Sequence, residues 1–109
     1  PYALTEFLNR ISSSKSVYEA ITRGKDAEII LRGVREQMTR NLREVLTETF
    51  PSSEPDMPLD ALISYIVGAQ LTFIDWWILT RNTYTSEKVA AILHRLQRLA
   101  IRDAYGLDS

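Results

Sequence analysis

Apolar residues recur every three or four positions along most of the chain, which is the period of an α-helix. Strand-like alternation of apolar and polar residues is nowhere sustained. The spacing predicts five helices, at about residues 4–11, 16–22, 26–50, 58–82 and 86–105. We therefore expect an all-α fold, a five-helix bundle that forms a single domain over residues 1–109.

Capping residues and helix breakers mark the ends of these segments. Ser16 and Glu19 match a capping box, and Gly24 is the natural stop of the short second helix. The run Pro-Ser-Ser-Glu-Pro-Asp at 51–56 predicts a linker between the third and fourth helices. The run 85–87, Thr-Ser-Glu, predicts the start of the last helix.

The third predicted helix has two distinct faces. Its apolar stripe consists of Ala27, Ile30, Leu31, Val34, Met38, Leu42 and Val45. Its opposite face carries charges of alternating sign four residues apart, at Glu28, Arg32, Glu36, Arg40 and Glu44. Such a face pairs with itself in solvent, so the apolar stripe decides where the helix packs.

The fourth predicted helix is apolar around most of its circumference, which is typical of a helix enclosed by several neighbours. The stretch from Leu59 to Leu79 has the roughly 20 residues that span a bilayer. It also carries Asp60 and Asp75, which are costly in lipid, so we expect a buried helix and no membrane contact.

The last two helices have wider apolar arcs than one small domain covers. We expect them to form a four-helix interface with a second copy of the chain. The residues expected at this interface are Gly68, Val89, Leu93, Leu96, Leu99 and Ala100. The alternative is that the first three helices cover both arcs.

Composition removes several classes of function. The chain has 109 residues, no cysteine and a formal net charge of −1. The absence of cysteine excludes disulfides and Cys-ligated metals, and the charge argues against an autonomous nucleic-acid binder. His94 is the only histidine, and no nucleophile–base pair or metal-ligand spacing accompanies it. We expect His94 to be a packed or half-exposed residue, and we expect no enzymatic activity, metal or cofactor.

Two amides stand in apolar sectors, Asn41 on the third helix and Gln70 on the fourth. We expect both to be buried, and a buried amide needs a hydrogen-bond partner. One reading is a ligand cavity between these helices, lined by Tyr18, Met38, Asn41, Gln70, Phe73 and Trp77. The other reading is an internal hydrogen bond or a buried water.

Several motifs in this order resemble the C-terminal domain of the tetracycline-repressor (TetR) family of transcription regulators. They are Phe-Leu-Asn-Arg at 7–10, Ser-Val-Tyr at 16–18, Tyr-Ile-Val-Gly-Ala at 65–69, Trp-Ile-Leu at 77–79 and Thr-Ser-Glu-Lys-Val-Ala at 85–90. The resemblance covers essentially the whole chain. Ile78 stands where one branch of the family usually has Leu.

The resemblance implies a cytoplasmic, effector-binding domain that forms a homodimer through its last two helices. In the family, DNA is bound by an N-terminal helix-turn-helix domain, which we do not expect within residues 1–109. Because the chain starts at Pro1, without an initiator Met, we expect that domain upstream. The effector itself is unknown. The alternative function is a ligand-free helical dimerisation module of a co-regulator.

Overall fold

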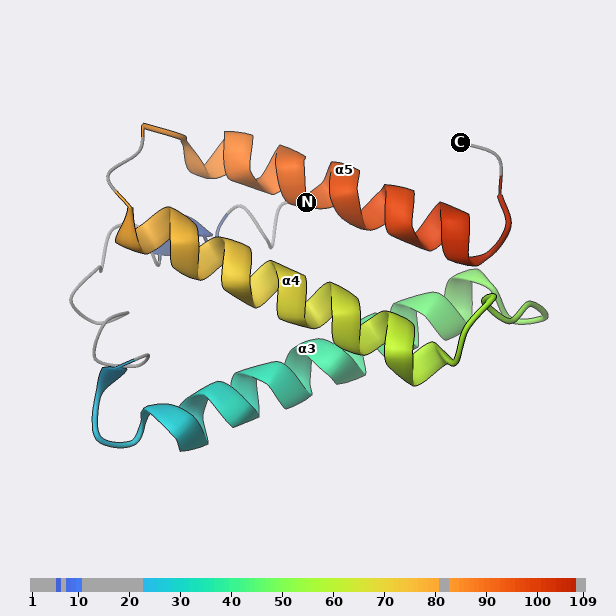
Figure 1. Ribbon diagram of the computed structural model, residues 1–109, viewed down its shortest axis with the longest axis horizontal. Coiled ribbons are helices and arrows are strands. Elements are labelled where there is room, and N and C mark those ends of the chain that lie inside the picture. The colour runs from blue at the N-terminus through green and yellow to red at the C-terminus, as the bar shows by residue number, and fades with distance from the viewer. Residues whose placement is uncertain (1–5, 7, 11–22, 81–82, 108–109) are drawn as a thin grey trace.

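The structure is a computed structural model that describes residues 6, 8–10, 23–80 and 83–107. Its three long helices are α3 (Ala27–Thr49), α4 (Leu59–Leu79) and α5 (Ser86–Ala104) (Figure 1). Residues 6 and 8–10 are also helical, and no strand occurs in the described part of the chain. The all-α expectation is therefore confirmed, whereas the short helix expected at 16–22 lies outside the described residues.

Helix α4 is the central element of an antiparallel layer. It contacts α3 on one side and α5 on the other, as Figure 1 shows. The molecule measures 43 × 30 × 20 Å. Because one helix with its side chains is about 10 Å across, the shortest dimension is about two helices deep. A layer this thin leaves much of the surface of its central helix near solvent.

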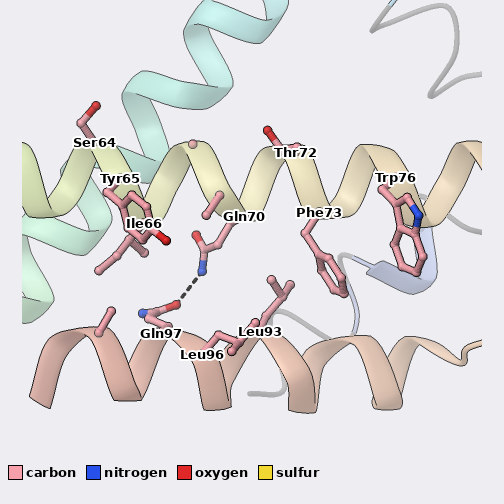
Figure 2. Close-up of a pocket in the computed structure, with 13 residues that line it drawn as sticks. Ser64, Tyr65, Ile66, Gln70, Thr72, Phe73, Trp76, Leu93, Leu96 and Gln97 are labelled. Atoms are coloured by element: carbon pink, nitrogen blue, oxygen red, sulfur yellow. Dashed lines mark hydrogen bonds between the residues drawn. The ribbon is translucent and has the colours of Figure 1, made fainter. Parts of the chain in front are cut away.

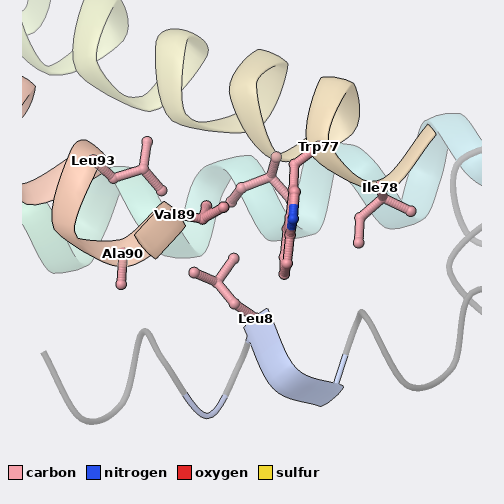
Figure 3. Close-up of a cluster of buried hydrophobic side chains, with 7 residues drawn as sticks. Leu8, Trp77, Ile78, Val89, Ala90 and Leu93 are labelled. Atoms are coloured by element: carbon pink, nitrogen blue, oxygen red, sulfur yellow. The ribbon is translucent and has the colours of Figure 1, made fainter. Parts of the chain in front are cut away.

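The core is divided into two clusters, and α4 contributes to both. The first joins Leu8 of the N-terminal segment to the second half of α4 and the first half of α5 (Figure 3). Its buried members are Leu8, Ile74, Trp77, Ile78, Val89, Ala90 and Leu93. The second cluster joins the end of α3, the start of α4 and Ala104 near the end of α5. Each end of α4 is thus anchored by different partners.

Local contacts fix both ends of the α4–α5 pair. At one end the Thr85 side chain caps α5 by accepting the Lys88 N–H at 3.1 Å, and the Trp77 indole N–H donates to the Tyr84 carbonyl at 3.0 Å. At the other end the α3–α4 linker is held against the end of α5. There the Asp56 N–H donates to the Ala104 carbonyl at 2.6 Å. These contacts set how far α5 can slide along α4.

By length and composition alone, α4 could cross a membrane. That observation is weak evidence, because the central helix of a soluble bundle passes the same test. Seven residues of α4 are buried among protein side chains, including Ile63, Val67 and Ile74. Helix α4 therefore fits the description of a core helix, as the carboxylates in its sequence suggested.

Candidate functional site

An open groove of about 860 Å³ lies between α4 and α5 (Figure 2). Helix α4 lines it with Ser64, Tyr65, Ile66, Gly68, Ala69, Gln70, Thr72, Phe73 and Trp76. Helix α5 lines it with Leu93, Leu96, Gln97 and Ala100. The groove is formed because small residues, Gly68 and Ala69 on α4 and Ala100 on α5, leave space between the two helices.

Large apolar side chains around this groove remain exposed. The exposed fractions are 70% for Tyr65, 56% for Leu96 and 42% for Trp76. Single exposed apolar residues are ordinary, but a contiguous set that borders a groove marks an interaction surface. The side of α4 that the sequence predicts to be enclosed is therefore uncovered in one copy of the chain.

One polar contact crosses the floor of the groove. The Gln70 Nε2 of α4 donates to the Gln97 Oε1 of α5 at 2.5 Å, and both side chains are partly buried (Figure 2). Gln70 is thus satisfied by the neighbouring helix, which is the internal hydrogen bond that the sequence left open. Gln97 was not singled out from the sequence. It is also an amide in an apolar arc, so the criterion that found Gln70 would have found it.

Aromatic rings close one end of the groove. Phe73 and Trp76 are stacked with ring centroids 5.3 Å apart, and Trp76 lies 6.2 Å from Tyr84. Trp77 points away from the groove into the first core cluster and is only 6% exposed. Phe73 therefore faces the groove, whereas Trp77, one turn further along the same helix, packs in the core.

The ligand cavity predicted between the third and fourth helices does not form as expected. Asn41 is exposed and accepts a hydrogen bond from Gln37 at 2.8 Å, so the expectation of its burial is wrong. Met38 packs against the second core cluster, whereas Phe73 and Trp77 belong to the first. None of the three described cavities joins Met38 to Phe73 or Trp77. Tyr18 lies outside the described residues.

The structure separates the predicted interface residues into two groups. Gly68, Leu93, Leu96 and Ala100 line the groove, and Leu99 is exposed on the same helix. Val89 is fully buried in the first core cluster, against Leu8 and α4, so it has no surface left for a second copy. Its assignment to an interface is therefore wrong. Leu93 is 4% exposed and forms part of the groove floor.

His94 on α5 is partly buried, and its Nε2 has no hydrogen-bond partner in the described structure. Burial lowers the pKa of His94 below its ordinary value of 6.5, because the charged imidazolium loses hydration. No group of three or more potential metal ligands occurs among the described residues. The arrangement around His94 therefore favours a neutral, packed imidazole.

A comparison with family models gives one match. The TetR-type model described as "Transcriptional regulator C-terminal region" matches residues 2–99. The match includes α3, α4 and most of α5, and hence the whole described groove except Ala100. No curated protein and no solved structure matches the chain.

Proposed function

The chain belongs to the TetR family of transcriptional regulators, as a C-terminal region, and from that premise we propose how it works. We propose that it is a regulatory domain that forms a homodimer through the groove face of α4 and α5. In this role, α4 and α5 of one copy pack against α4 and α5 of the other in a four-helix arrangement. The interface is isologous, since both copies present the same surface.

The exposed apolar groove is the observation that carries this proposal. Exposing Tyr65, Leu96 and Leu99 to water is unfavourable by about 25 cal/mol for each Å² of apolar surface. A second copy removes that surface without requiring any change in the intramolecular core. Gly68 and Ala100 permit close approach of the partner helices, because they place almost no side chain between the backbones.

We further propose that a small effector biases the arrangement of the two copies. An effector shifts a conformational equilibrium only when it binds one arrangement more tightly than the other. The two copies would in turn set the spacing of the DNA-binding domains that the family carries upstream. Since the net charge of this chain is −1, we assign DNA binding to those domains and not to this one. We also place the protein in the cytoplasm, as its family suggests.

The alternative is a dimerisation module that binds no small molecule. The Gln70–Gln97 hydrogen bond favours this alternative for the groove itself, since it satisfies the amide that a ligand was expected to satisfy. The two functions differ in one observable, which is whether a small molecule raises the melting temperature of the dimer.

Sedimentation of two matched variants tests the dimer. Leu96 and Val45 are both exposed aliphatic residues, at 56% and 54%, but only Leu96 lines the groove. We expect Leu96→Glu to yield a monomer, because two carboxylates would be buried at an isologous interface. We expect Val45→Glu on α3 to remain a dimer. A wild-type chain that sediments as a monomer at all concentrations, or equal behaviour of both variants, contradicts the proposal.

A further inference from the structure

A second, smaller cavity of about 260 Å³ lies between α3 and α4, and it is unusually rich in charge. Helix α3 supplies Arg35, Thr39 and Arg43, which are four residues apart and so lie on one face. Helix α4 supplies Asp60, Ser64, Ile63 and Val67. Ile63 and Val67 are each 1% exposed, whereas Arg35, Asp60 and Ser64 are exposed. Polar atoms and aliphatic carbons therefore both line the accessible wall of this open cavity.

The two helices face each other here in a regular register. Arg43 Nη2 contacts Asp60 Oδ1 at 2.5 Å, and it forms both a hydrogen bond and an ion pair. One turn further along each helix, Thr39 and Ser64 line the same cavity. Figure 2 shows the Ser64 side chain pointing away from α5, the side on which α3 lies.

One more turn along, the register brings Arg35 to Gly68. The Arg35 Nη1 atom lies 3.8 Å from the position that a Cβ of Gly68 would occupy. The first level of this register is the pair Arg43 and Asp60, a cation and a carboxylate. The second level is Thr39 and Ser64, two hydroxyl-bearing residues at the same cavity. The third level places a cation over a residue without a side chain. An anion is missing from that level.

Arg35 also lacks a partner on its own helix. Positions three and four residues away hold Leu31, Arg32, Met38 and Thr39, none of which is acidic. No ion pair or hydrogen bond of Arg35 occurs among the described residues. The charged residues that line the cavity are Arg35, Arg43 and Asp60, which gives a net charge of +1.

We propose that this cavity binds a small monocarboxylate, held by Arg35 with Thr39 and Ser64. The planar guanidinium presents two parallel N–H donors that match the two oxygens of a carboxylate, and the hydroxyls donate to the same oxygens. A monoanion neutralises the site, whereas a dianion leaves it negative and faces Asp60. This inference rests on the proposed effector-sensing function and names the chemical class of the effector.

The site adjoins the dimerisation groove, which explains how occupancy could influence assembly. Ser64 lines both the cavity and the groove, and Gly68 lines the groove while Arg35 covers it from the α3 side. A carboxylate bound to Arg35 therefore changes the charge directly behind the interface helix. The bound carboxylate and the dimerisation groove are separated only by α4, so binding can affect dimerisation without a rearrangement of the core.

Titration of the ¹⁵N-labelled 109-residue chain followed by NMR tests the site. The probes are sodium acetate, hexanoate and benzoate, with benzamide as the neutral analogue of benzoate and inorganic phosphate as the dianion, all at constant ionic strength. We expect at least one carboxylate to shift the Arg35 Nε–H and the Thr39 and Ser64 amides to saturation. Benzamide should leave these signals in place, and phosphate should bind more weakly than the best carboxylate.

Two matched variants assign the binding to one guanidinium. We expect Arg35→Gln to raise the dissociation constant about tenfold or more, since it removes a charge-assisted contact. Arg32→Gln, on the outward face of the same helix, should leave the constant unchanged. Equal effects of the two variants, tighter binding of phosphate, or no saturable shift with any of the three carboxylates overturns the inference.

Sedimentation of Arg35→Gln separates this inference from the proposed dimer. If the variant becomes monomeric, Arg35 pairs with a carboxylate of the second copy, and the ligand site is overturned while the dimer stands. If the wild-type chain is monomeric but carboxylates still bind through Arg35, the dimer fails and the site stands.

Discussion

Two glutamines, one on each helix, supply the polar contact across a mostly apolar groove. Gln70 and Gln97 are partly buried and bond to each other across α4 and α5. Leucine at both positions would bury more apolar surface. A polar pair at the centre of a helical interface is known to fix register and partner number at a cost in stability. We interpret the glutamine pair as such a device for the register of α4 against α5.

This interpretation predicts the effect of separating the pair. We expect Gln70→Leu to lower the free energy of unfolding by about 1 kcal/mol, because Gln97 loses its partner in a partly buried position. We expect the double variant Gln70→Leu/Gln97→Leu to recover most of that loss. Urea denaturation of the four proteins of this cycle measures the coupling. A single variant more stable than the wild type contradicts it.

His94 predicts a pH dependence of stability. Because burial lowers the pKa of folded His94 below 6.5, the unfolded chain binds this proton more readily than the folded chain. The free energy of unfolding should therefore be highest above pH 6.5 and should decrease as the pH falls below that value. His94 is the only histidine, so the variant His94→Gln isolates its contribution. Urea melts of both proteins at pH 7 and about pH 5.5 should show a smaller decline in the variant.

Asn41 and Gln70 show where sequence reasoning succeeds and fails for single residues. The same argument, an amide within an apolar arc, predicted burial of both. It holds in part for Gln70 and fails for Asn41, because the buried face of α3 is narrow and contains only Leu42 and Leu46. Val45, one residue away from Leu46, is 54% exposed. The periodicity of the sequence shows on which side of its helix each side chain lies. Whether that side is buried depends on where the neighbouring helix packs.

At the scale of elements, the bounds of the three long helices could be predicted within about three residues. Strong local signals mark them, such as the Thr85 side chain that caps α5 and the proline-containing linker before α4. The contacts between elements could not be predicted in the same way. The sequence placed a cavity between the third and fourth helices around apolar residues, whereas the structure places the apolar groove between α4 and α5. Pairing of helices depends on tertiary geometry that single-helix patterns do not contain.

Among the described residues of the N-terminal segment, Leu8 belongs to the core. Leu8 is fully buried among Trp77, Val89 and Leu93 (Figure 3). We expect Leu8→Ala to lower the free energy of unfolding by about 2–5 kcal/mol, because it leaves a cavity in the first core cluster. The adjacent Asn9 is exposed, so Asn9→Ala is the matched control and should change stability little. Equal melting temperatures for the two variants would show that the segment does not stabilise the helices.

At the scale of the whole molecule, the thin shape and the open groove point to the same conclusion. A molecule 20 Å deep offers two broad faces, and the groove with its exposed leucines lies along the α4–α5 pair. The four-helix interface inferred from wide apolar arcs in the sequence agrees with this arrangement. Which of its residues face outward could not be inferred, since Val89 and Leu96 share the same stripe and have opposite environments.

A dimer makes stability depend on protein concentration. We expect the apparent melting temperature of the wild-type chain to rise as its concentration rises, because association stabilises only the folded copies. The variant Leu96→Glu should melt at one temperature throughout the same range. Differential scanning calorimetry over a wide concentration range measures both. A concentration-independent wild type would place the groove residues on the surface of a monomer.

The two adjacent tryptophans give the molecule its own optical reporters. Trp76 is 42% exposed beside the groove, whereas Trp77 is 6% exposed in the core, and the chain has no other tryptophan. In the variant Trp77→Phe, the remaining indole emits from the edge of the interface, and its fluorescence should shift to the blue when a second copy excludes water from it. In Trp76→Phe, the emission reports on the core and changes only on unfolding. Neighbouring positions on one helix thus distinguish assembly from folding without any added label.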